Sequence, residues 1–140
     1  MTELVPPEEE PPGGGGIREL ARVSTSERDG TIVVAVTGEI DLSNIERLAQ
    51  VIFAQPNTGE GLIVDLSAVG YLDSTAVSLL HDLALRLRKR AQQLVVVSPS
   101  DSPPRRVLDL TALYVNAPLV EHLDSAVAII RRDPELPAAS

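Results

Sequence analysis

Short apolar runs alternate along this chain with segments of helical periodicity, and few folds accommodate that alternation. The apolar runs are rich in β-branched residues, which is typical of strands buried in a sheet. They lie at residues 31–37, 61–66 and 94–97, and a further strand is predicted at 20–26 and a short extended segment at 115–121. Asp29 and Gly30 lie between the first two strands, where they predict a hairpin turn.

Four other segments place apolar residues three and four positions apart, as on one face of an α-helix. Ser43 and Glu46 have the spacing of a capping box, so the first helix is expected to begin near Ser43. The other three are expected from about Ala76 to Arg90, from Ser102 and Pro103, and from a cap at Asp124. The resulting order, β-β-α-β-α-β-α-(β)-α, predicts an α/β fold with a mainly parallel central sheet of about four to five strands and about four flanking helices.

The predicted folded domain covers residues 17–133, and a Glu-, Pro- and Gly-rich tail at 1–16 precedes it. This tail cannot bury enough apolar surface to offset the entropy of ordering it, so it is expected to be disordered. Residues 134–140 are expected to form a short C-terminal tail. The chain lacks a targeting pattern and an apolar stretch approaching the roughly 20 residues of a transmembrane helix, so we expect a cytoplasmic protein without membrane insertion.

Composition argues against several kinds of site. The chain has no cysteine, which removes disulfides, cysteine-ligated metals and thiol nucleophiles. Its net charge is −8 and aromatic residues make up only 2 % of it, so binding to nucleic acid is not expected. The two histidines, His81 and His122, do not have the spacing of metal ligands, and no nucleophile elbow or phosphate-binding loop is present. We therefore expect no metal, no cofactor and no catalytic activity.

The most informative polar cluster is formed by Asp73, Ser74 and Thr75, at the predicted change from a loop to a helix. One interpretation is structural, because a side-chain oxygen at this place can accept hydrogen bonds from the first amides of the helix. The other is functional, because an exposed hydroxyl there could carry a phosphate of about −1.5 to −2 charges at a helix N-terminus. The residue pattern alone leaves both interpretations open.

Three short motifs, in their order and spacing, resemble the STAS domain. They are Val36–Leu42 (VTGEIDL), Leu62–Ser67 (LIVDLS) and Tyr71–Thr75 (YLDST). Within this family the chain resembles the bacterial anti-sigma-factor antagonists, and Arg106–Leu113 resembles their third helix. The similarity covers about residues 23–131. It implies a mainly parallel sheet flanked by helices, which agrees with the order of elements derived above.

The resemblance implies a binding module and not an enzyme. Antagonists of this kind bind an anti-sigma factor that is itself a serine kinase with an ATP-binding kinase fold, and this binding releases a sigma factor. Phosphorylation of one serine stops the binding, and a phosphatase restores it. That serine corresponds to Ser74, and Asp41 and Asp73 match acidic residues that lie near it in the family. ATP would be the cofactor of the partner and not of this chain.

The residues expected at the partner-binding surface are Asp41, Tyr71, Leu72, Asp73, Ser74 and Thr75. Thr75 is the second candidate for phosphorylation after Ser74. Tyr71 and Leu72 are either an apolar anchor at the edge of this surface or part of the core. The sequence departs from the family motif at Ala76, where the motif continues with glycine, and this departure bears on phosphorylation more than on binding.

Two other functions compete with this one. STAS domains also serve as subunits of transporters and of larger signalling assemblies, so the chain could be a constitutive adaptor that is not phosphorylated. An enzyme is the third possibility, as a small hydrolase that uses Ser74 as its nucleophile. That hydrolase would need a base and an oxyanion hole, and the sequence contains no motif for either.

Overall fold

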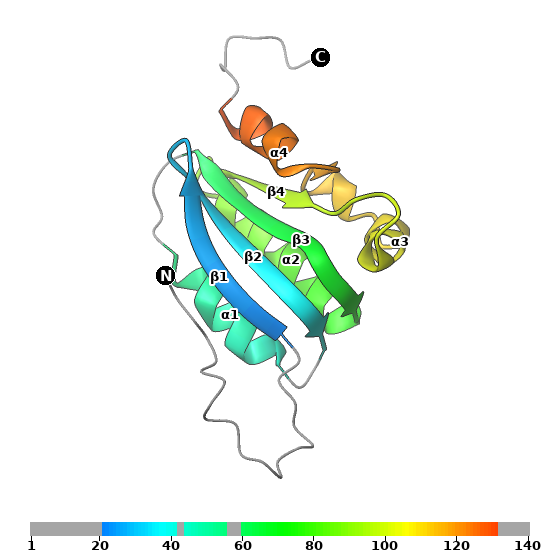
Figure 1. Ribbon diagram of the computed structural model, residues 1–140. Coiled ribbons are helices and arrows are strands. Elements are labelled where there is room, and N and C mark those ends of the chain that lie inside the picture. Colours follow the sequence, from blue (N-terminus) through cyan, green and yellow to red (C-terminus); the bar gives the residue numbers. More distant parts are fainter. Residues whose placement is uncertain (1–20, 42–43, 56–59, 132–140) are drawn as a thin grey trace.

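The computed structural model describes residues 21–41, 44–55 and 60–131, and it leaves Ser43 and both predicted tails outside the described residues. Five strands form one sheet in the order β1-β2-β3-β4-β5 (Figure 1). The strands are β1 (Ala21–Arg28), β2 (Thr31–Ile40), β3 (Gly61–Leu72), β4 (Gln93–Val97) and β5 (Leu119–Val120). β1 pairs with β2 in antiparallel orientation, and the other three strand pairs are parallel.

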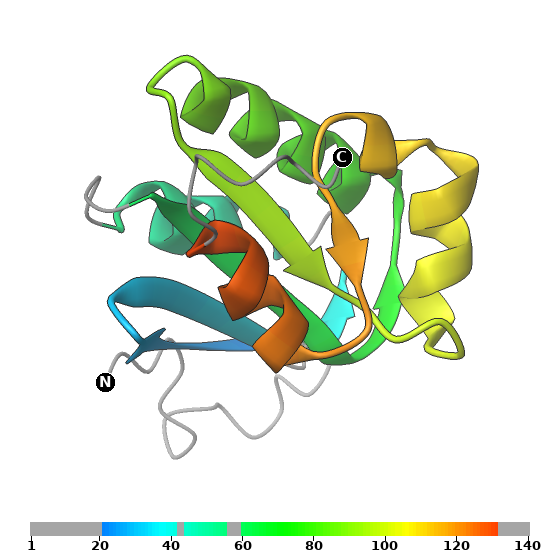
Figure 2. The same ribbon diagram turned by 90° about the horizontal axis from the view of Figure 1, so that it is seen from above.

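Helices pack against both faces of this sheet. They are α1 (Ile45–Phe53), α2 (Ser74–Arg88), α3 (Pro103–Leu110) and α4 (Leu123–Ile130), with one turn of 3-10 helix, η3 (Leu113–Val115). α1 and α2 lie on one face and α4 lies on the other (Figure 2). The predicted fold class, a mainly parallel sheet flanked by helices, is therefore confirmed.

Strand side chains alternate between two apolar clusters, because successive residues of a strand point to opposite faces of the sheet. Val34 and Val64 belong to the larger cluster, which includes residues of α1 and α2. Val33 and Ile63 belong to the smaller cluster, which includes residues of α4. Strands that are covered on both faces read as continuous apolar runs, which is why they could be recognised in the sequence.

β2 and β3 continue past the ends that the sequence predicts for them. The sequence predicts that β2 ends at Thr37, because Gly38 interrupts its β-branched run, and that β3 ends at Leu66. In the structure Gly38 has a φ of 99° and the pairing register shifts after it, so the interruption is an irregularity within the strand pair and not its end. As a result Ile40 pairs with Leu72, and the two strands end side by side.

The chain between α3 and α4 differs from the extended segment predicted at 115–121. Only Leu119–Val120 is a strand, and η3 precedes it. Ala112, at the start of η3, adopts a left-handed conformation with φ 58° and ψ 36°. Few residues other than glycine and asparagine adopt this conformation readily, so the alanine gave no signal of a turn.

The last helix does not begin as predicted. α4 starts at Leu123 after His122, and the predicted cap Asp124 lies within the first turn. The Asp124 carboxylate accepts a hydrogen bond of 2.7 Å from the guanidinium of Arg28, in β1. A carboxylate in the first turn still complements the helix dipole. Asp124 therefore marks the start of α4 correctly, although it is not the N-cap residue.

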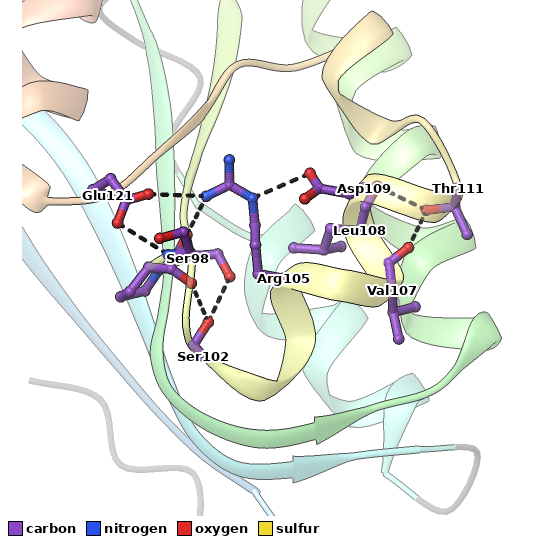
Figure 3. A network of polar contacts seen from close by, with 10 residues as sticks. Ser98, Ser102, Arg105, Val107, Leu108, Asp109, Thr111 and Glu121 are labelled. Carbon is purple, nitrogen blue, oxygen red and sulfur yellow. Dashed lines mark hydrogen bonds and ion pairs between the residues drawn. The ribbon is translucent and has the colours of Figure 1, made fainter.

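Arg105 joins α3 to the ends of β4 and β5 (Figure 3). Its Nη1 donates to the carbonyl oxygen of Ser98 at 2.6 Å. Its guanidinium also forms ion pairs with Asp109, at 3.1 Å, and with Glu121, at 3.6 Å. Ser102, predicted to cap α3, forms no side-chain cap, and its hydroxyl lies 3.1 Å from that of the buried Ser98. Because only 18 % of the Arg105 side chain is exposed, this network fixes α3 against the edge of the sheet.

Candidate functional site

The predicted site residues lie where β2 and β3 end. Asp41 follows Ile40, Asp73 follows Leu72, and Ile40 and Leu72 are paired across the two parallel strands. The backbone N–H of Asp73 donates to the carbonyl oxygen of Ile40 at 3.2 Å, so the pairing continues into the site. The structure therefore brings together two aspartates that are far apart in the sequence, and both are half-buried.

The end of β2 is hydrogen-bonded to Asn44, a residue for which the sequence gives no signal. Its Oδ1 accepts a hydrogen bond of 3.1 Å from the backbone N–H of Asp41, and its Nδ2 donates to the carbonyl oxygen of Glu39 at 2.9 Å. The carbonyl oxygen of Asp41 in turn accepts from the N–H groups of Asn44 and Ile45. α1 thus begins at Ile45, close to the predicted start, with Asn44 as its N-cap residue, while the predicted cap Ser43 lies outside the described residues. The backbone of Asp41 is fixed beside the start of α2.

Asp73 is the N-cap of α2. Its backbone is extended, and its Oδ1 accepts from the backbone N–H of Thr75 at 2.9 Å and of Ala76 at 3.3 Å. The same oxygen accepts the hydroxyl of Thr75 at 2.6 Å. The structural interpretation is therefore correct for Asp73, and it also accounts for the hydroxyl of Thr75.

Ser74 is the first residue of α2, and its side chain is exposed. Thr75 is half-buried and its hydroxyl already donates to Asp73, whereas the hydroxyl of Ser74 forms no hydrogen bond with another described residue. Capping thus explains two of the three polar side chains and leaves Ser74 as the accessible hydroxyl.

The neighbours of this cluster differ in exposure. Leu72 is buried in the larger apolar cluster, whereas Tyr71 is exposed, because adjacent residues of a strand point to opposite faces. Ala76, where the family motif has glycine, is also buried in that cluster. Its methyl group therefore points into the core and away from any partner that approaches Ser74. Ser78 lies one turn after Ser74 and is exposed on the same side of the helix.

The chemistry available at this site is that of an exposed hydroxyl that directly follows Asp73 in the chain, with Asp41 at the end of the neighbouring strand. Neither His81 nor His122 forms a hydrogen bond with Ser74 in the described part of the chain, and Nδ1 of His81 lies 2.9 Å from the side-chain amide of Asn116. Within residues 21–41, 44–55 and 60–131, no cluster of His, Cys, Asp or Glu could hold a metal ion. None of the helices described above has the length and apolar character needed to cross a bilayer.

Comparisons with known proteins give a consistent result. A family model described as the STAS domain matches residues 22–126. The chain is similar to the crystal structure of an anti-sigma factor antagonist from Mycobacterium paratuberculosis, with 33 % sequence identity and a TM-score of 0.70. This similarity covers 79 % of this chain and 94 % of that one.

Two more distant structures have the same fold. A putative anti-sigma factor antagonist from Thermotoga maritima is 19 % identical, with a TM-score of 0.69 over 79 % of this chain and 95 % of that one. The anti-sigma factor antagonist SpoIIAA, in its unphosphorylated form, is 19 % identical, with a TM-score of 0.62 over 78 % of this chain and 96 % of that one. The structural neighbours are thus anti-sigma factor antagonists, although at this identity the last two support only the fold.

Proposed function

The chain belongs to the STAS domain family, and on this basis we propose that it is an anti-sigma factor antagonist that binds an anti-sigma factor and so releases a sigma factor. A relative that is 33 % identical, and of whose length 94 % is covered, carries that description. The observation that carries the proposal is the exposed hydroxyl of Ser74, at the start of α2 and beside the strand ends that bear Asp41 and Asp73.

Phosphorylation of Ser74 is the proposed switch. A phosphate adds about −1.5 to −2 charges, and here it would follow the half-buried Asp73 directly and lie at the strand ends that also bear Asp41. Desolvating such a group in an interface without paired cations is costly. A penalty of roughly 3 kcal/mol would weaken binding by more than a hundredfold. Thr75 is the poorer acceptor of a phosphate, because its hydroxyl is already donated to Asp73.

The proposed partner is an anti-sigma factor that is also a serine kinase with an ATP-binding fold, and a phosphatase would reverse the modification. The chain itself would do no chemistry and would need no cofactor. Asp41, Asp73, Ser74 and Thr75 would contact the partner, with the exposed Tyr71 at the edge of the contact. Leu72 would support this surface from the core and not touch the partner, since it is buried.

Binding of purified anti-sigma factors of the host organism to four forms of the chain tests this proposal. We expect wild type and Ser74→Ala to bind one of them with similar affinity and Ser74→Glu to bind it more than a hundredfold more weakly. Ser125→Glu is the matched control, because Ser125 is an exposed serine in the first turn of α4, on the opposite face of the sheet. With ATP present, mass spectrometry should detect phosphate on wild type and none on Ser74→Ala.

Two results would contradict the proposal. If wild type bound none of these anti-sigma factors, the antagonist function would be wrong. If Ser74→Glu and wild type bound the same partner equally and no phosphate formed on Ser74, the switch would be wrong and the constitutive adaptor would be the better description.

A further inference from the structure

The exposed face of α2 continues from Ser74 along the whole helix. Ser74, Ser78, His81 and Leu85 are spaced by three and four residues, so they lie along one side of α2. At 1.5 Å per residue, Ser74 and Leu85 are about 16 Å apart along the helix axis. Leu85 is an apolar residue on this otherwise polar line, and 44 % of it is exposed.

A second group of exposed apolar residues lies at the end of α3 and in η3. Leu110, Val115 and Tyr114 are exposed by 73 %, 66 % and 59 %, which are the highest values among the large apolar residues that the structure describes. Leu113, the first residue of η3, is fully buried and anchors the turn in the core. The turn therefore presents its other two side chains to solvent.

Asn116 connects the two groups. Its side-chain amide lies 2.9 Å from Nδ1 of His81, and its carbonyl oxygen accepts a hydrogen bond of 3.3 Å from Arg88. Leu85 lies between His81 and Arg88 on the same side of α2, and Val115 precedes Asn116 in the chain. η3 accordingly lies beside α2 (Figure 2). The exposed apolar residues of these neighbouring elements, Leu85 of α2, Leu110 of α3 and Tyr114 and Val115 of η3, are called here the apolar strip.

A typical protein interface is wide enough to include both Ser74 and the apolar strip. A specific interface covers about 800 Å² on each partner, which corresponds to a patch about 30 Å across. A partner that covers Ser74 and follows α2 for half of that width therefore reaches Leu85 and the adjoining η3. Exposed apolar side chains that gather on neighbouring elements are typical of interaction surfaces.

Charges at the two ends of this surface indicate how the partner lies on it. Asp41 and Asp73 are at the Ser74 end, whereas Arg88 and Arg106 flank the apolar strip. Arg106 precedes Leu110 by one turn of α3, and neither arginine forms an ion pair with a carboxylate among the described residues. The matching surface would be apolar at its centre and acidic opposite the arginines, with no cation beside Ser74.

We propose that the apolar strip is the central part of the surface that binds the anti-sigma factor, and that Ser74 lies at its edge. This inference rests on the proposed function. It assigns most of the binding energy to Leu85, Leu110, Tyr114 and Val115, because apolar and aromatic residues in the centre of an interface dominate its affinity. A phosphate on Ser74, at the edge, would then prevent the partner from binding, although most of the binding energy comes from the apolar strip.

The experiment measures Kd by calorimetry for the host anti-sigma factor that binds wild type, using Val115→Asp, Leu110→Asp and Tyr114→Ala. Each is expected to weaken binding by at least about tenfold, which is the typical effect at a central interface residue. Ala128→Asp is the control, because Ala128 is exposed on α4, on the opposite face, and it should leave Kd unchanged. Circular dichroism and urea unfolding show whether each variant is folded. If an introduced aspartate unfolds η3, Tyr114→Ala still tests the inference, because it only shortens an exposed side chain.

The outcomes separate this inference from the function on which it rests. If Ser74→Glu abolishes binding while all three strip variants bind like wild type, the antagonist function stands and the strip is not part of the interface. If wild type sediments as a dimer and Val115→Asp as a monomer, without a change in Kd for the anti-sigma factor, the strip is a self-association surface and the inference is overturned. If no host anti-sigma factor binds wild type, the proposed function and this inference both fail.

Discussion

Replacing Asp73 should separate the structural role of this residue from its electrostatic one. Asp73→Ala removes an oxygen that accepts from two backbone amides and from the Thr75 hydroxyl. Losing an N-cap costs about 1 kcal/mol, and leaving a half-buried hydroxyl without its acceptor costs about 1 kcal/mol more. We therefore expect the free energy of unfolding to fall by roughly 2 kcal/mol. Urea unfolding measures this fall as a lower midpoint with an unchanged slope.

Asp73→Asn is the control, because asparagine caps helices about as well as aspartate but carries no charge. Its free energy of unfolding should stay within about 0.5 kcal/mol of wild type, the usual range for a neutral surface change. If Asp73→Asn lost as much stability as Asp73→Ala, the charge and not the cap would hold the start of α2. If Asp73→Ala were as stable as wild type, the hydrogen bonds at Oδ1 would contribute nothing and the reasoning would be refuted.

Two further predictions concern the network at the end of β4. Arg105→Ala should lower the free energy of unfolding by about 2 kcal/mol, because hydrogen bonds to charged groups contribute about 1.5–3 kcal/mol each. Arg106→Ala is the control, because it removes an exposed arginine. In the same urea experiment its free energy of unfolding should stay near that of wild type. The pKa of Glu121 lies below its ordinary value, chiefly because the backbone N–H of Ser100 donates to its carboxylate. Its contribution to stability is therefore present above the ordinary pKa of a glutamate and is lost as the pH falls through the lowered value. The urea midpoints of wild type and Glu121→Gln should differ at pH 7, and the difference should shrink as the pH falls below the ordinary pKa of a glutamate. A difference that stays constant with pH would contradict this.

The sequence could predict the order of strands and helices because the apolar runs and their periodicity are local signals. It could not predict where β2 ends, because the pairing of Ile40 with Leu72 decides this across about thirty residues of chain. The role of Asn44 could not be predicted either, because its hydrogen bonds to Asp41 and Glu39 form only when the end of β2 and the start of α1 lie side by side. The apolar strip was missed because apolar residues in a helical pattern are usually buried, and only the fold shows that Leu110 is not.

The two interpretations of the Asp73–Thr75 cluster are complementary, and together they determine what a phosphate on Ser74 would do. A helix N-terminus can bind an anion because its first amides are unpaired. Here Asp73 already accepts from the N–H groups of Thr75 and Ala76, so a phosphate on Ser74 would have to displace a carboxylate to use them. The phosphate would therefore remain exposed and strongly charged instead of being hydrogen-bonded by the first amides of the helix. Such a group changes the surface that the partner meets while the domain beneath it keeps its fold.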